Sequence, residues 1–171
     1  MNILPSNNKS LYGYKEIFSN LKELFDNSRL PNKIIFSGEK GIGKSTLAYH
    51  LTNYIFSLCE ENKYDFDNNC IDVNNYSYNL ILKNTHPNFF FISNDADKNN
   101  IQISKVREMI NFTNKSSFNN LCKIILIDNI ELLNANSVNA LLKIIEEPNN
   151  NIFFFLVHNN KKQILDTLKS R

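Results

Sequence analysis

A glycine-rich run from Gly38 to Ser45 carries residues that could bind phosphate. Its sequence, Gly-Glu-Lys-Gly-Ile-Gly-Lys-Ser, fits the P-loop pattern G-x-x-x-x-G-K-[ST]. Glycine lets the backbone turn tightly, so that its N–H groups can face phosphate oxygens. In such a loop Lys44 reaches the outer phosphates, and the Ser45 hydroxyl can hold Mg²⁺. The predicted nucleotide-binding residues are Gly38, Glu39, Lys40, Gly41, Ile42, Gly43, Lys44, Ser45 and Thr46.

The segments on both sides of this run agree with a P-loop. Residues 33–36 form a short apolar run of the kind that makes a buried strand. From Lys44 to about Leu58 the apolar residues recur at helical spacing, and the amino end of such a helix favours bound anions. The alternative is a chance glycine-rich loop, which would not require this strand–loop–helix context.

Asp128 is the candidate metal-binding carboxylate. It directly follows an apolar run, Lys123-Ile-Ile-Leu-Ile127, that predicts a buried parallel strand. A carboxylate at that point can hold Mg²⁺ together with Ser45, directly or through water. The alternative is an aspartate that only caps the turn after the strand.

The residues after Asp128 bear on nucleotide hydrolysis. Many P-loop ATPases place a glutamate directly after this acid to orient the attacking water, and this chain has Asn129, a poor base. Glu131 could substitute, although a solvated loop acid is the simpler interpretation. The sequence thus predicts nucleotide binding more firmly than turnover.

Strands and helices alternate along the chain. The helices are expected at 14–27, at 44–58, from about Lys105 with Ser104 as N-cap, from Asn136 or Ser137 as N-cap to Pro148, and from about Lys161; the strands are expected at 33–36, 89–93, 123–128 and 152–157. The polar segment 60–85 has weak periodicity and is an insertion, a disordered region or a poorly ordered helix pair. This alternation predicts an α/β domain with a parallel sheet and helices on both faces.

In such a sheet, ligands bind beyond the carboxyl ends of the strands. The P-loop, Asp128 and Asn159 all follow or end predicted strands. We therefore expect one site to collect them. His158 is expected to be only a neighbour of that site.

Composition narrows the class of protein. A chain of 171 residues with 42% hydrophobic residues is typical of one globular domain. The net charge of +2 does not by itself indicate a nucleic-acid-binding protein. Neither a membrane span nor a signal peptide is evident in the sequence, so we expect a cytoplasmic protein. The three cysteines have no spacing typical of a zinc site or a disulfide framework.

Several motifs, in order, resemble the bacterial DNA polymerase III clamp-loader subunits, a family of AAA+ proteins. Asn139-Ala-Leu-Leu-Lys-Ile-Ile-Glu-Glu-Pro148 is similar to the family's N-A-L-L-K-x-L-E-E-P stretch, and Ser170-Arg171 is similar to the start of its S-R-C motif. The block from His86-Pro87 to Arg107 also resembles the family pattern. Asn129, the sequence after the P-loop and the missing zinc-cysteine cluster favour the delta-prime type over the motor type.

The resemblance implies a RecA-like AAA+ base domain over residues 1–171 that binds ATP and Mg²⁺. By position, Arg171 would reach the ATP of a neighbouring subunit, and Asn159 would be a polar sensor residue. The implied partners are the motor (gamma/tau) and delta subunits and, indirectly, the sliding clamp and primer–template DNA, with no membrane. The family continues beyond this point with a helical lid and collar. The alternatives are an autonomous P-loop ATPase of the motor type and a small-molecule kinase.

Overall fold

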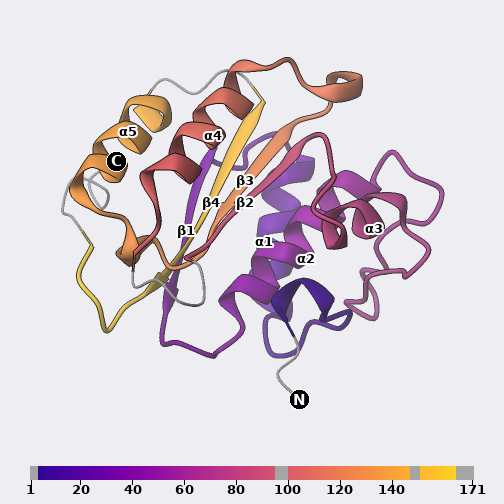
Figure 1. Ribbon diagram of the computed structural model, residues 1–171. Coiled ribbons are helices and arrows are strands. Elements are labelled where there is room, and N and C mark those ends of the chain that lie inside the picture. Colours follow the sequence, from indigo (N-terminus) through magenta and orange to yellow (C-terminus); the bar gives the residue numbers. More distant parts are fainter. Residues whose placement is uncertain (1–3, 95–99, 147–150, 165–171) are drawn as a thin grey trace. The chain divides into compact units, whose positions relative to one another are not determined.

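The computed structural model describes residues 4–94, 100–146 and 151–164 (Figure 1). The chain folds into two compact units. One is built from Met1–Pro31 and Gly43–His86, and the other from Asn32–Ile42 and Pro87–Arg171. The chain therefore passes from the second unit to the first within the glycine-rich run, between Ile42 and Gly43.

A four-stranded parallel sheet forms the centre of the second unit. Its strands are β1 (Lys33–Gly38), β2 (Phe89–Ile92), β3 (Lys123–Ile127) and β4 (Ile152–Asn159), in the order β1-β4-β3-β2. Every residue of β3 is buried, as expected for a strand with both faces covered. The predicted α/β fold with a parallel sheet is confirmed.

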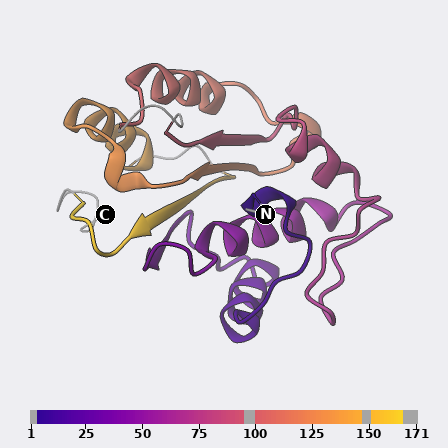
Figure 2. The ribbon, with the colours of Figure 1, turned by 60° about the horizontal axis from the view of Figure 1, so that its bottom comes forward.

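Two helices cover one face of this sheet, α4 (Ile103–Asn114) and α5 (Ala135–Glu146) (Figure 2). Alternate residues of β3, Ile125 and Ile127, pack in one apolar core with residues of both helices. Ile124 of the opposite face is also fully buried. Two short 3-10 turns complete the unit, η2 (Phe118–Asn120) and η3 (Ile130–Leu132).

Both predicted N-caps in this unit are wrong. Helix α4 begins at Ile103 after an extended Gln102, so Ser104 lies inside the first turn. Helix α5 is capped by Asn134, whose side-chain oxygen accepts a hydrogen bond from the Ser137 N–H at 2.8 Å. A cap is chosen by where the backbone leaves helical geometry, and several polar residues in a row leave that choice open.

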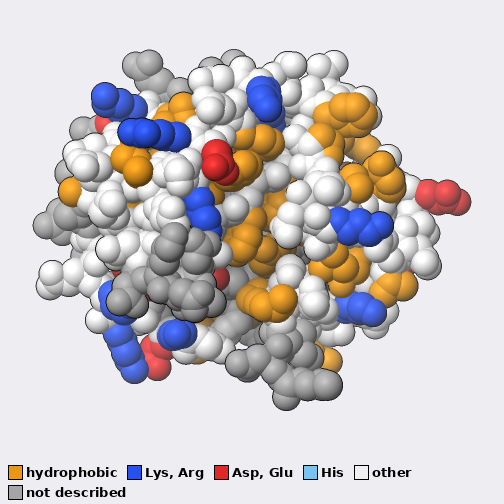
Figure 3. All heavy atoms as spheres, viewed as in Figure 1, with side chains coloured by type: hydrophobic (Ala, Val, Ile, Leu, Met, Phe, Trp, Pro, Cys, Tyr) orange, Lys and Arg blue, Asp and Glu red, His pale blue; other side chains and the backbone are white. Residues whose placement is uncertain are grey.

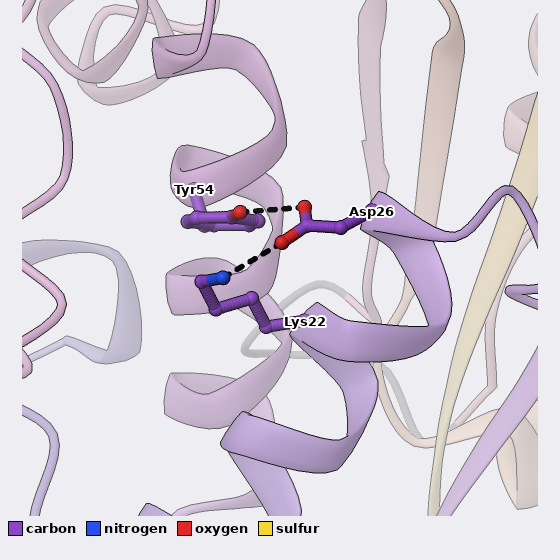
Figure 4. A network of polar contacts seen from close by, with 3 residues as sticks. All are labelled: Lys22, Asp26 and Tyr54. Atoms are coloured by element: carbon purple, nitrogen blue, oxygen red, sulfur yellow. Dashed lines mark hydrogen bonds and ion pairs between the residues drawn. The ribbon is translucent and has the colours of Figure 1, made fainter.

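The first unit contains η1 (Pro5–Asn7) and the helices α1 (Lys15–Asp26), α2 (Lys44–Ser57) and α3 (Tyr76–Leu82). Phe18 of α1 is fully buried, and its ring packs against those of Tyr54, Tyr64 and Phe66. The Tyr54 hydroxyl of α2 donates to Asp26 of α1 at 2.7 Å, and Lys22 pairs with the same carboxylate (Figure 4). Helices α1 and α2 agree with the predicted segments.

The segment 60–85 contains one helix, α3, and not a helix pair. The Glu60 carboxylate accepts hydrogen bonds from the backbone N–H groups of Tyr76 and Ser77 and from the Asn75 side chain. Asn75 also caps the helix by accepting from the Tyr78 N–H. Hydrogen bonds made by polar side chains thus hold this segment in place. Such bonds need no regular spacing of apolar residues, so the sequence did not reveal the helix.

Hydrophobic side chains lie among polar and charged ones on the face that Figure 3 shows. Val73 and Tyr76, before and at the start of α3, are among the large hydrophobic residues that are exposed. Among the described residues, no helix is both long enough and apolar enough to span a bilayer.

Candidate functional site

The glycine-rich run joins the end of β1 to the start of α2. Gly41 and Gly43 have φ angles of 87° and 91°, a left-handed conformation that favours glycine. A Cβ atom at Gly41 would meet nothing within 4 Å, so the backbone conformation and not space requires glycine there. Gly38, in contrast, is the last residue of β1 and is not among the positive-φ glycines. The sharp turning therefore takes place at the second and third glycines of the run.

The predicted binding residues are divided between the two units. Gly38, Glu39, Lys40, Gly41 and Ile42 belong to the second unit, with Asp128 and Asn159, whereas Gly43, Lys44, Ser45 and Thr46 belong to the first. Lys44 is the first residue of α2. Ser45 and Thr46 follow in the first turn, where the positive end of the helix dipole favours an anion.

The carboxyl ends of the strands bring the second-unit residues to one edge of the sheet. Gly38 and Asn159 are directly paired between β1 and β4. Asp128 follows β3, and its N–H donates to the Ile92 carbonyl at 2.8 Å. The structure thus places the start of the loop, Asp128 and Asn159 at the same edge of the sheet, as the strand order required.

Two hydrogen bonds hold Asn159, one through its backbone and one through its side chain. Its N–H donates to the Glu131 carboxylate at 3.2 Å, and its side-chain oxygen accepts from the Lys161 N–H at 3.2 Å. Glu131 is half-buried, and its carboxylate links the turn after β3 to the end of β4. Pairing of β3 with β4 produces that contact, and no local sequence pattern indicates it. The interpretation of Glu131 as a solvated loop acid stays a prediction.

Asn129 follows Asp128 with φ at 57°, in the left-handed region. Asparagine tolerates this conformation better than glutamate does. An asparagine at position 129 therefore suits the left-handed backbone found there.

The sequence did not indicate which residues His158 contacts. Its imidazole is buried, with Nδ1 at 3.0 Å from the Ser37 hydroxyl and Nε2 at 2.9 Å from the Lys162 carbonyl oxygen. Ser37 directly precedes the glycine-rich run. The only sequence sign was a histidine in an apolar strand beside Asn159.

An exposed ion pair lies at the same edge, between Lys161 Nζ and Glu39 at 3.3 Å. Both side chains are more than half exposed, so solvent screens the pair strongly. Lys161 and Lys162 lie in a turn, and no helix begins there up to Ile164. Arg171, Ser170, Glu147 and Pro148 lie outside the described residues.

Comparison with known proteins identifies relatives over most of the chain. The family model described as "DNA polymerase III, delta subunit" matches residues 13–171. DNA polymerase III subunit delta' of Pseudomonas aeruginosa is 29% identical over 134 residues, which are 78% of this chain and 39% of that protein. The same subunit of Buchnera aphidicola subsp. Baizongia pistaciae is 34% identical over 146 residues, covering 82% of this chain and 42% of that protein.

A solved structure shares the fold. A DNA polymerase III gamma subunit-related protein from Thermotoga maritima aligns with a TM-score of 0.56 at 20% identity, over 90% of this chain and 43% of that one. The chain spans less than half of the length of the curated relatives named above. By the match over residues 13–171, the chain belongs to the DNA polymerase III delta subunit family, and its curated relatives named here are delta-prime subunits.

Proposed function

We propose that this chain is the nucleotide-binding base part of a delta-prime-like subunit of the DNA polymerase III clamp loader, and that it helps to load the sliding clamp during replication. The observation that carries the proposal is a P-loop with strand, left-handed glycines and helix in order, within a chain of this family. In this role residues 38–46 bind ATP. Ser45 and Asp128 hold Mg²⁺, which would neutralise charge on the phosphates.

The arrangement supports binding of ATP more than its hydrolysis. Residue 129, where many P-loop ATPases have a glutamate that orients the attacking water, is an asparagine in this chain. Asn129, a neutral amide, cannot act as the general base. The Glu131 carboxylate accepts a hydrogen bond from the Asn159 backbone. We propose a subunit that binds ATP and hydrolyses it weakly or not at all.

The proposed partners are the motor (gamma/tau) and delta subunits, with the sliding clamp and primer–template DNA contacted through the assembly. Asn159 would act as the sensor beside the P-loop. Arg171 would reach the γ-phosphate of ATP on a neighbouring subunit, because an arginine in that position stabilises charge on the transferring phosphoryl group.

Equilibrium binding of a fluorescent ATP analogue in the presence of Mg²⁺ tests the nucleotide site. Lys44→Ala should weaken binding at least about tenfold, since it removes a charged donor to the phosphates. Lys83→Ala is the matched control, because Lys83 is exposed and follows α3. Equal binding by wild type and Lys44→Ala would contradict the proposed site.

Gel filtration with the clamp-loader motor subunit, with and without Mg-ATP, tests the assembly. Co-elution supports the subunit role, and separate peaks contradict it for this 171-residue chain. A steady-state ATPase activity of the isolated chain that Lys44→Ala abolishes would instead favour a motor-type ATPase, and phosphoryl transfer to a small molecule would favour a kinase.

A further inference from the structure

His158 joins the strand that precedes the P-loop to the chain that follows β4. The Lys162 carbonyl oxygen can only accept, so His158 Nε2 donates to it. In the neutral ring Nδ1 then carries no proton and accepts from the Ser37 hydroxyl. Both ring nitrogens are used within the protein, so this side chain has no nitrogen left to contact a nucleotide.

Besides the pairing of Ser37 with His158 and of Gly38 with Asn159 in the sheet, two further contacts run between the same two segments. The Asn160 N–H donates to the Gly38 carbonyl at 3.1 Å, and Lys161 pairs with Glu39. The His158 side chain is buried and its two bonds are partly buried, whereas the Lys161–Glu39 pair is exposed. Solvent therefore weakens the His158 bonds less than it weakens the Lys161–Glu39 pair.

If the side chain at position 158 served only to pack the core, an apolar residue would be sufficient. Alternate residues of β4, Phe154 and Leu156, lie in the apolar core of the second unit, and His158 continues this alternation. An apolar residue at this position would avoid the cost of burying an imidazole. In this chain the imidazole instead has two hydrogen-bond partners, Ser37 before the P-loop and Lys162 beyond the strand.

We propose that His158 is a positioning residue that couples the P-loop to residues 160–164. The proposal rests on the proposed nucleotide site. A change in the backbone of the loop on binding Mg-ATP would move Ser37 and Gly38, and the hydrogen bonds through His158 would carry that change to the Lys162 backbone. The chain continues from there to Arg171, so ATP on this chain would influence the segment proposed to reach a neighbouring subunit.

Amide NMR spectra of the ¹⁵N-labelled chain, titrated with Mg-ATP, test this coupling. In the wild type, the peaks of Gly41 and Gly43 should shift on binding, and those of residues 161–164 should shift with the same midpoint. In His158→Phe the loop peaks should still shift, with a Kd about fivefold higher. The response of residues 161–164 should be lost.

Ser37→Ala provides a second variant that removes only a hydroxyl from an exposed residue, and it should also lose the response at residues 161–164. Ser104→Ala is its matched control, because Ser104 is an exposed serine of α4 outside the network. Unchanged peaks of β3 will show that the sheet is intact in each variant.

A response of residues 161–164 that survives in both His158→Phe and Ser37→Ala overturns the coupling. So does a wild-type chain in which the loop peaks shift and residues 161–164 do not. If Mg-ATP at millimolar concentration shifts no loop peak in the wild type, the proposed nucleotide site itself fails, and the coupling fails with it.

Discussion

At the scale of single residues, two buried histidines are held in the neutral form. His50 is fully buried; its Nε2 donates to the Asn8 carbonyl and its Nδ1 lies 2.7 Å from the Tyr64 hydroxyl. Burial lowers the pKa of His50 to about 4, although the hydrogen bond to Asn8 opposes the shift. His86 stacks on Phe56, and burial likewise lowers its pKa to about 4.

Because of these two histidines, we expect the free energy of unfolding to fall in mild acid. The pKa of each histidine is lower in the folded chain than its ordinary value of 6.5, so unfolding takes up protons between pH 6.5 and 4. Their contribution is complete above pH 6.5 and is lost as pH falls toward 4. In that window each histidine should add about 1.4 kcal/mol per pH unit to the slope of the unfolding free energy. Urea unfolding across this range measures the slope.

His50→Gln separates the two contributions, because glutamine can keep a donor for the Asn8 carbonyl but does not titrate. The variant should lose about half of the histidine-dependent slope, and its stability at pH 7 should fall. An unchanged slope would show that His50 does not titrate in this range.

At the scale of elements, the Asp26 carboxylate joins α1 to α2. Burial raises the pKa of Asp26, but hydrogen bonds from Lys22 and Tyr54 outweigh this effect and the pKa is lowered. Tyr54→Phe removes the bond between the helices and should cost about 1 kcal/mol. Lys22→Met removes a pair within α1 that is partly exposed, and should cost less than 0.5 kcal/mol. Urea unfolding midpoints show which variant loses more stability. A larger loss of stability in Lys22→Met than in Tyr54→Phe would contradict this prediction.

Helix α3 depends on a carboxylate from outside the helix. Glu60 accepts from the Ser77 hydroxyl as well as from the backbone N–H groups of Tyr76 and Ser77. Glu60→Gln keeps the shape but turns an NH₂ group toward these donors, and should cost about 2 kcal/mol. In Glu60→Gln, amide hydrogen exchange should become faster in α3 than in the other helices. Glu61→Gln, at an exposed neighbour, is the control and should leave exchange in α3 unchanged.

At the scale of the whole molecule, the P-loop residues are shared between the two units. A nucleotide that binds the folded P-loop and not the unfolded chain should stabilise the folded protein. At a concentration of 100 times Kd, Mg-ATP should add about 2.7 kcal/mol to the unfolding free energy. A thermal melt should therefore shift upward, and Lys44→Ala should abolish the shift. A wild-type melt that Mg-ATP leaves unchanged would contradict the proposed nucleotide site.

The sequence by itself determined the strands, most of the helices and the P-loop. Apolar runs such as Ile124–Ile127 are long enough to indicate buried strands without any partner, and the glycine-rich run carries its own backbone requirement at Gly41 and Gly43. The alternation of strands and helices then implied a parallel sheet. A parallel sheet was enough to place Asp128 and Asn159 at one edge, because the carboxyl ends of its strands lie together.

Only the tertiary structure decided which polar side chains meet. Glu131 contacts Asn159, and His158 contacts Ser37, because β4 lies between β1 and β3. Glu60 reaches α3 across 16 or more residues of sequence that have no apolar period. Hydrogen bonds between residues distant in sequence depend on register and orientation, and neither is encoded in local spacing.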